Sequence, residues 1–150
     1  MVKLSTKYLT LLIVILSFIG AIVSGYLWYH HIVLTEQRED ANLIPCTIGD
    51  SFNCDTVNTS SYSELFGIPI AIFGLLSYIM VGLIGVFIFF SNKKNIWLIL
   101  NVMTGLMSLY GIYLFYISKF MIGAYCIFCI VTYLCSFGLF GSSYLGWKRS

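Results

Sequence analysis

The chain has 150 residues, of which 59% are hydrophobic, 17% aromatic and 9% charged, with a mean hydropathy of +0.93 and a net charge of +2. Soluble domains carry about 25% charged residues, so this composition excludes an ordinary water-soluble protein and indicates a membrane protein. The basic residues stand singly or in pairs beside apolar stretches instead of clustering on one solvated face, which argues against nucleic acid as a partner.

Four apolar stretches predict four transmembrane helices, because each is close to the roughly 20 residues that cross a bilayer core. They cover residues 8–29, 68–90, 96–117 and 125–145. Lys3 and Lys7 precede the first stretch, as in a secretory signal, but its length of about 22 residues favours a membrane span. The sequence therefore predicts an all-α membrane protein, a bundle of four transmembrane helices forming a single domain over residues 1–150.

The distribution of basic residues predicts the orientation of these helices, since cytoplasmic loops carry the excess of Lys and Arg. Six of the eight basic residues lie in the first tail, in the second connection and at the C-terminus: Lys3, Lys7, Lys93, Lys94, Lys148 and Arg149. We therefore expect both termini in the cytoplasm. The loop over residues 35–63 and the short turn over residues 118–124 then lie on the outer face.

Cysteines gather at the predicted outer face. Cys46 and Cys54 lie in the long loop, and Cys126 and Cys129 lie at the outer end of the fourth helix. Disulfides persist in an oxidising compartment, so structural bridges are one interpretation. A bridge between Cys46 and Cys54 would close only a small ring and gain little loop entropy, which leaves a redox role open. Cys135 has no partner in the sequence and is expected to be buried by packing.

The pair Cys126-x-x-Cys129 favours a chemical role, because a helix already restrains residues three apart. The unpaired N–H groups of a first helical turn lower the pKa of a cysteine, which makes Cys126 the expected exchanging thiol. We expect the nearby Lys119 to lower it further. Cys129 would lie about 4–5 Å deeper, at the apolar edge of the bilayer, where a lipid-soluble partner can reach it. Tyr133 shares this helical face, although ordinary packing also explains it.

A zinc site is the other use of four cysteines. The seven-residue spacing of the first pair and the position of Cys129 at the lipid boundary argue against it, so no metal is expected. His30 and His31 end the first helix, where we expect them to reach the membrane surface rather than to act as ligands or catalysts.

Several elements of the chain form a recognisable series. In chain order they are Cys46-x7-Cys54, Ser60, the run Tyr-Ser-Glu-Leu-Phe-Gly-Ile-Pro over residues 62–69, Phe73-Gly74, and Cys126-Ile-Phe-Cys129-Ile-Val-Thr132-Tyr133. Together they resemble the vitamin K epoxide reductase family, in particular its prokaryotic members, which are disulfide-forming oxidases. The resemblance covers essentially the whole chain. It implies that Cys46, Cys54, Cys126 and Cys129 are catalytic, and that Ser60, Phe73, Cys129 and Tyr133 lie at a quinone of the ubiquinone, menaquinone or vitamin K type.

The activity that this resemblance implies is a quinone-dependent thiol oxidoreductase in a prokaryotic cell membrane. It would reoxidise a thioredoxin-like partner, which we expect to be a separate protein because no thioredoxin-like domain is present in the sequence. The animal enzymes carry an Asn where this chain has Ile70, which argues against epoxide reduction. Alternatives are a vitamin K epoxide reductase of the endoplasmic reticulum, a conductor of reductant across the membrane, and a non-enzymatic protein stabilised by disulfides.

The loop is also expected to carry a short helix. Ser61-x-x-Glu64 matches a capping box, a pattern that begins helices. We expect this helix to lie on the membrane surface, with Leu65 and Phe66 covering the quinone pocket and Ser60 at its mouth.

Overall fold

The computed structural model describes residues 2–36, 49, 51–91 and 93–150 of the chain. Within these residues, four helices are long and apolar enough to cross a membrane. They are α1 (Val2–Thr35), α3 (Ile70–Phe90), α4 (Lys94–Ile117) and α5 (Ile127–Arg149). The predicted bundle of four transmembrane helices is therefore confirmed, although α1 extends beyond the predicted stretch at both ends.

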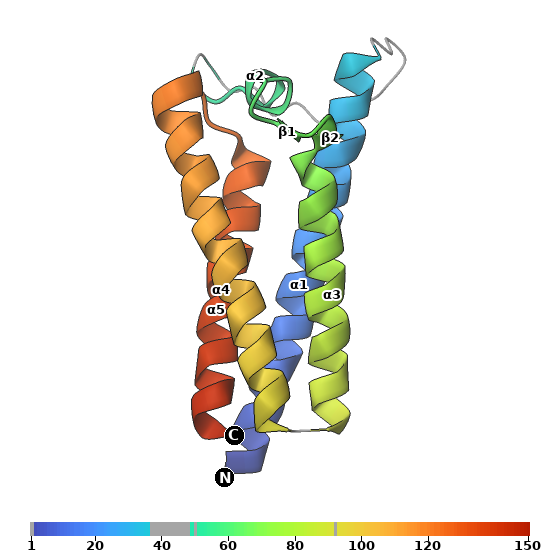
Figure 1. The fold of residues 1–150 in the computed structure, drawn as a ribbon, viewed down its shortest axis with the longest axis vertical. Coiled ribbons are helices and arrows are strands. Elements are labelled where there is room, and N and C mark those ends of the chain that lie inside the picture. The colour runs from blue at the N-terminus through green and yellow to red at the C-terminus, as the bar shows by residue number, and fades with distance from the viewer. Residues whose placement is uncertain (1, 37–48, 50, 92) are drawn as a thin grey trace.

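The four long helices run alongside one another, and both termini lie at the same end of the bundle (Figure 1). α1 packs along α3 and α5, and α4 packs along α5. At the opposite end, residues 51–69 lie over the helices, and we call them the cap. The cap contains helix α2 (Cys54–Asn58) and the antiparallel strands β1 (Glu64–Leu65) and β2 (Ile68–Pro69).

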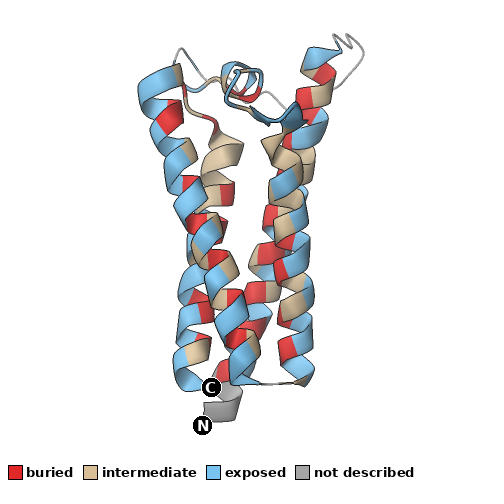
Figure 2. Ribbon diagram, in the orientation of Figure 1, coloured by how far each residue is buried: buried red, intermediate tan, exposed pale blue. Residues whose placement is uncertain are grey.

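The outer surface of the bundle is apolar, as a lipid-facing surface must be. No more than 33% of any of the four apolar windows is buried inside the protein. Side chains such as Phe18, Leu83, Leu106 and Leu134 are more than 60% exposed, and Figure 2 shows exposed residues along the full length of the helices. Apolar area of this extent is unfavourable in water and favourable in a bilayer. The chain is a multi-pass membrane protein.

Small residues bring the helices close together. A side chain at Gly20 would overlap with the ring of Tyr78, and one at Gly146 would overlap with the ring of Trp97. Across α4 and α5, the hydroxyls of Thr104 and Ser143 lie 2.9 Å apart. Small residues and shared hydroxyls are typical of packing between membrane helices, where the hydrophobic effect gives no preference for helix contact over lipid.

The cap differs from the prediction. Residues 61–63 form turns and residues 64–69 form the β1–β2 hairpin, so the helix expected from Ser61 is wrong, and the short helix α2 lies earlier in the chain. Two physical reasons explain this. The Glu64 carboxylate contacts His31 instead of capping a helix, and Phe66 and Gly67 both have positive φ, as a tight two-residue hairpin turn requires.

The connection between α4 and α5 also differs from the expected simple turn. α4 continues without a break into a π-helical turn, η1 (Ser118–Ile122), and ends at Gly123, whose φ of 72° lies in the left-handed region. The Ser118 hydroxyl donates to the carbonyl oxygen of Ala124, which closes the connection. The chain then enters α5 directly through Tyr125 and Cys126.

Candidate active site

Two backbone hydrogen bonds attach the cap to the segment that precedes α5. Tyr125 N–H donates to Ser51 O at 2.9 Å, and Asn53 N–H donates to Tyr125 O at 3.0 Å. These bonds pair Phe52 with Tyr125 as in a parallel sheet, and their two rings also lie in contact. Cys54 directly follows Asn53 and Cys126 directly follows Tyr125, so these two bonds hold the two cysteines close together at the cap end of the bundle.

Cys54 and Cys126 are both almost fully buried, with 1% of each side chain exposed, in one cluster with Leu27. Cys129 packs against the same cluster. Cys54 is disulfide-bonded, whereas Cys126, Cys129 and Cys135 are free thiols. The structure therefore brings together three of the four cysteines predicted to be catalytic. The fourth, Cys46, lies outside the described residues.

Cys126 is the N-cap of α5, directly before its first turn, whereas the sequence predicted it within that turn. Its sulfur accepts a hydrogen bond from the backbone N–H of Cys129, at 3.3 Å. The pKa of the Cys126 thiol is lowered, chiefly by a hydrogen bond from the Cys129 thiol and further by backbone N–H groups, which outweigh the opposite effect of burial. Lys119 is not among the causes, because its ammonium lies over the Phe120 ring. The expectation for Lys119 was wrong.

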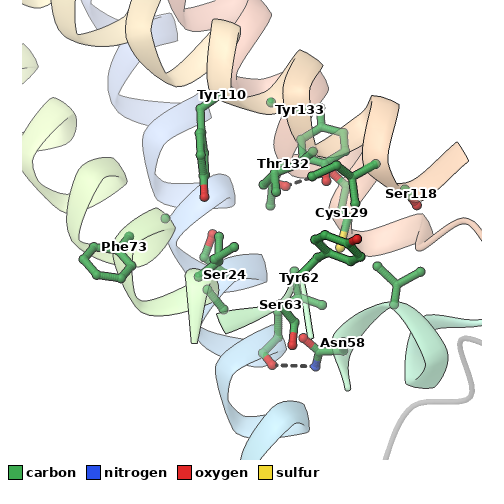
Figure 3. Close-up of a pocket in the computed structure, with 18 of the residues that line it drawn as sticks. Ser24, Asn58, Tyr62, Ser63, Phe73, Tyr110, Ser118, Cys129, Thr132 and Tyr133 are labelled. Carbon is green, nitrogen blue, oxygen red and sulfur yellow. Dashed lines mark hydrogen bonds between the residues drawn. The ribbon is translucent and has the colours of Figure 1, made fainter. Parts of the chain in front are cut away.

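A pocket with a volume of about 180 Å³ lies between the cap and the four long helices (Figure 3). Cys129 lies in its wall, and most of the surrounding side chains are apolar or aromatic. A thiol thus lines a largely apolar pocket at the end of a membrane bundle. Such a site suits a ring compound that arrives from the lipid.

The structure places most of the predicted quinone-site residues in this pocket and excludes two. Ser60, Phe73, Cys129 and Tyr133 line it. Leu65 and Phe66 do not: they lie on the β1–β2 hairpin and are 43% and 95% exposed. In their place the cap contributes residues that sequence reasoning missed, namely Val57, Asn58, Tyr62 and Ser63.

One comparison with known proteins decides the family. The family model described as "Vitamin K epoxide reductase family" matches residues 11–144, which is most of the chain and includes the pocket and the four cysteines of the outer end. The chain belongs to the vitamin K epoxide reductase family. Members of this family are membrane oxidoreductases that link thiol chemistry to a quinone, so thiol oxidoreduction and a membrane quinone are assigned to this chain in general terms.

In this member of the vitamin K epoxide reductase family, two buried histidines attach the cap to α1. His30 and His31 are 2% and 4% exposed, so the expectation that they reach the membrane surface was wrong. His30 Nε2 lies 3.2 Å from Asp55 Oδ1, and His31 Nε2 lies 3.1 Å from Glu64 Oε1. Asp55 directly follows Cys54, so these contacts hold α2 and the hairpin in place over the pocket.

Asn58 joins the two histidines. Its side-chain Nδ2 donates to Leu27 O at 3.0 Å and to His30 Nδ1 at 3.1 Å, and its backbone carbonyl oxygen accepts from His31 Nδ1 at 2.7 Å. His30 therefore accepts at Nδ1 and carries its proton on Nε2, which donates to Asp55. His31 already donates from Nδ1, so its bond to Glu64 requires an additional proton on one of these two side chains.

We expect Asn58→Ala to lower the free energy of unfolding by about 1–3 kcal/mol, because the substitution leaves His30 Nδ1 buried without its donor and removes a second hydrogen bond to Leu27 O. The measurement is the thermal midpoint of the detergent-solubilised protein. Thr59→Ala is the matched control, since the exposed Thr59 hydroxyl bonds, among the described residues, only Asp55 O one helical turn earlier. Equal midpoints for Asn58→Ala and the wild type would show that this network does not hold the cap.

Proposed function

We propose that this protein is a quinone-dependent thiol oxidase that reoxidises a thioredoxin-like protein through two cysteine pairs acting in series. The observation that supports this is the arrangement of the cysteines: Cys54 and Cys126 share one buried cluster, and Cys129 lines the adjoining pocket. Electrons entering at the cap therefore have a short route to an apolar pocket. A purely structural use of the cysteines gives no reason for a free thiol in the pocket wall.

The first step takes place at the cap. The oxidised protein presents a disulfide between Cys46 and Cys54, and a thiolate of the reduced partner attacks Cys46. The partner's second thiolate then attacks the mixed disulfide, so the partner leaves oxidised, and Cys46 and Cys54 become thiols. Two electrons have passed to the cap.

The second step transfers these electrons to α5. Cys54 thiolate attacks Cys126 in a disulfide between Cys126 and Cys129, which releases Cys129 as a thiol. Cys46 thiolate then attacks Cys54, restores the cap disulfide and releases Cys126. The lowered pKa of Cys126 supports this direction, because a more acidic thiol is a better leaving group.

The third step reduces the quinone substrate. The Cys129 proton moves to the Cys126 thiolate, and the Cys129 sulfur forms a bond to the quinone ring, which places negative charge on a quinone oxygen. Cys126 then attacks the Cys129 sulfur, so the sulfur–ring bond breaks, its electron pair stays on the ring, and the disulfide between Cys126 and Cys129 is restored. The released proton and a second proton from solvent complete the quinol. The net reaction converts a protein dithiol and a quinone into a protein disulfide and a quinol.

The proposal includes a location and an orientation. The excess of Lys and Arg at the end that holds both termini supports a cytoplasmic position for that end. The cap and the cysteines then face the outside of a prokaryotic cell membrane, where the oxidised partner introduces disulfides into other proteins. Residues 1–150 act as one catalytic domain, and the partner is a separate protein.

The experiment that tests this function measures quinone reduction by the detergent-solubilised protein supplied with a reduced thioredoxin-like protein. Ubiquinone and menaquinone analogues are tried in turn as acceptors, and free thiols of the partner are counted in the same reaction. The proposal predicts one quinol for each partner disulfide formed. No turnover with any of these acceptors would contradict it.

A further inference from the structure

Most polar side chains of the pocket already have hydrogen-bond partners within the protein. The hydroxyls of Ser63, Ser118 and Ser136, for example, each donate to a backbone carbonyl oxygen. The Tyr78 hydroxyl donates to Thr132 O. Their donor protons are thus engaged, and these residues present mainly a packed, apolar surface to a ligand.

Ser24 of α1 differs from them. It is only 3% exposed and lines the pocket, yet its hydroxyl makes no hydrogen bond to any residue that the structure describes. Every fully enclosed polar side-chain atom of the described residues has a partner, so the Ser24 oxygen must retain some accessible surface. For a side chain this deeply buried, the pocket is the space to which that surface opens. A hydroxyl in such surroundings is costly unless something bonds it.

The position of Ser24 is defined by α3. Its oxygen lies 3.1 Å from the point that a Cβ of Gly74 would occupy, so the missing side chain at Gly74 leaves room for the hydroxyl beside the pocket. Along α1, Ser24 lies about 4.5 Å deeper in the bundle than Leu27, which contacts the Cys54 and Cys126 cluster. Ser24 therefore belongs to the deeper part of the pocket, away from the cap.

Tyr110 of α4 supplies a second hydroxyl to the same part of the pocket. It lines the pocket and makes no hydrogen bond within the described residues. In Figure 3 its ring extends from α4 into the pocket, with the hydroxyl on the side of Ser24 and apart from Cys129. Two donors from different helices, neither with a partner among the described residues, thus face the deeper part of the pocket. The hydroxyls of Tyr62, Ser77 and Tyr133 line the pocket and also make no hydrogen bond within the described residues, whereas the other hydroxyls of the pocket are engaged.

We propose that Ser24 and Tyr110 donate hydrogen bonds to the quinone carbonyl that lies farther from Cys129, and so orient the ring for reduction. The inference rests on the proposed function. A quinone has two carbonyl oxygens on opposite sides of its ring, and both gain negative charge as electrons arrive. Donors placed at the far oxygen stabilise the bound quinone and its reduced form, because hydrogen bonds to a charged oxygen are stronger than those to a neutral one.

The test uses the full chain in detergent, a small dithiol as reductant and a soluble menaquinone analogue as acceptor. Cys129 lines the pocket, so we expect a small dithiol that enters the pocket to reduce Cys126 and Cys129 without the cap cysteines, and the assay then reports on the pocket alone. We expect Ser24→Ala to raise KM for the quinone by about tenfold and to lower kcat/KM by at least as much, as the loss of one hydrogen bond to a partly charged oxygen predicts. Tyr110→Phe should also raise KM for the quinone and lower kcat/KM.

Ser17→Ala is the matched control, because Ser17 is equally buried on α1 and lies against Gly82 of α3 as Ser24 lies against Gly74, but its hydroxyl donates to Val14 O and it does not line the pocket. Its KM should stay within twofold of the wild type. A Ser24→Ala KM equal to that of the control overturns the inference while wild-type turnover still supports the proposed function. Absence of quinone reduction by the wild type contradicts the proposed function itself. A single-turnover measurement of thiol exchange between the cap and α5 should be unchanged in Ser24→Ala.

Discussion

Replacement of Cys129 by alanine is expected to lower quinone reduction by about 10³-fold or more, with any reductant, because the thiol that passes electrons to the quinone is lost. Cys129 is the cysteine that lines the pocket among the described residues, and its two neighbours in the relay, Cys54 and Cys126, are buried in the adjoining cluster. No other described thiol can therefore take its place at the ring.

Cys135→Ala is the control for this prediction. Cys135 is also a free thiol of α5, but it packs in the core cluster with Tyr78 and Leu139 and does not line the pocket. Its replacement removes a small apolar group and should leave turnover within a few-fold of the wild type. If Cys129→Ala and Cys135→Ala had equal activity, the pocket would not be the place where electrons leave the protein.

Replacement of Cys54 by alanine is expected to separate the two halves of the relay. Turnover driven by a reduced thioredoxin-like protein should fall by about 10²–10³-fold, because the cap can no longer pass electrons to Cys126. Turnover driven by a small dithiol should stay within a few-fold of the wild type, since that reductant reaches Cys126 and Cys129 directly. The measurement is the ratio of the two rates in one preparation.

The ratio also distinguishes a broken relay from a folding defect. A folding defect would lower both rates together and leave their ratio unchanged. Cys54 is 1% exposed, so some loss of packing is expected from the substitution, and serine at the same position provides a second variant of similar size. Protein-driven turnover that survived in both variants would show that the partner reduces Cys126 and Cys129 without the cap.

The transmembrane helices could be predicted from the sequence because a bilayer demands a long apolar run whatever the helix contacts. Phe90 ends one such run and the observed α3 ends there, whereas α4 begins at Lys94, two residues before the predicted run. The role of Cys126 could be predicted in part, since the N-terminus of a helix acts through local N–H groups. The largest cause of its lowered pKa is the hydrogen bond from the Cys129 thiol, which the spacing of three residues between the two cysteines makes possible.

The cap could not be predicted in the same way, because its structure depends on contacts between residues far apart in the chain. Glu64 lies in a capping pattern, but His31, 33 positions earlier, takes its carboxylate. Asn53 and Thr56 form the helix cap that does exist, and this Asn-x-x-Thr pattern was a local signal that sequence reasoning missed. The unpaired hydroxyl of Ser24 becomes visible only when α3 and α4 are placed around it.

The central claim is that Cys54 and Cys126 exchange directly, and trapping their mixed disulfide tests it most directly. In a Cys46→Ala and Cys129→Ala double variant neither cysteine has its usual resolving partner. After mild oxidation and proteolysis, mass spectrometry should find a peptide that joins Cys54 to Cys126 in most of the protein. If Cys54 stayed a free thiol, or joined another cysteine, the two pairs would not act in series and the proposed relay would be wrong.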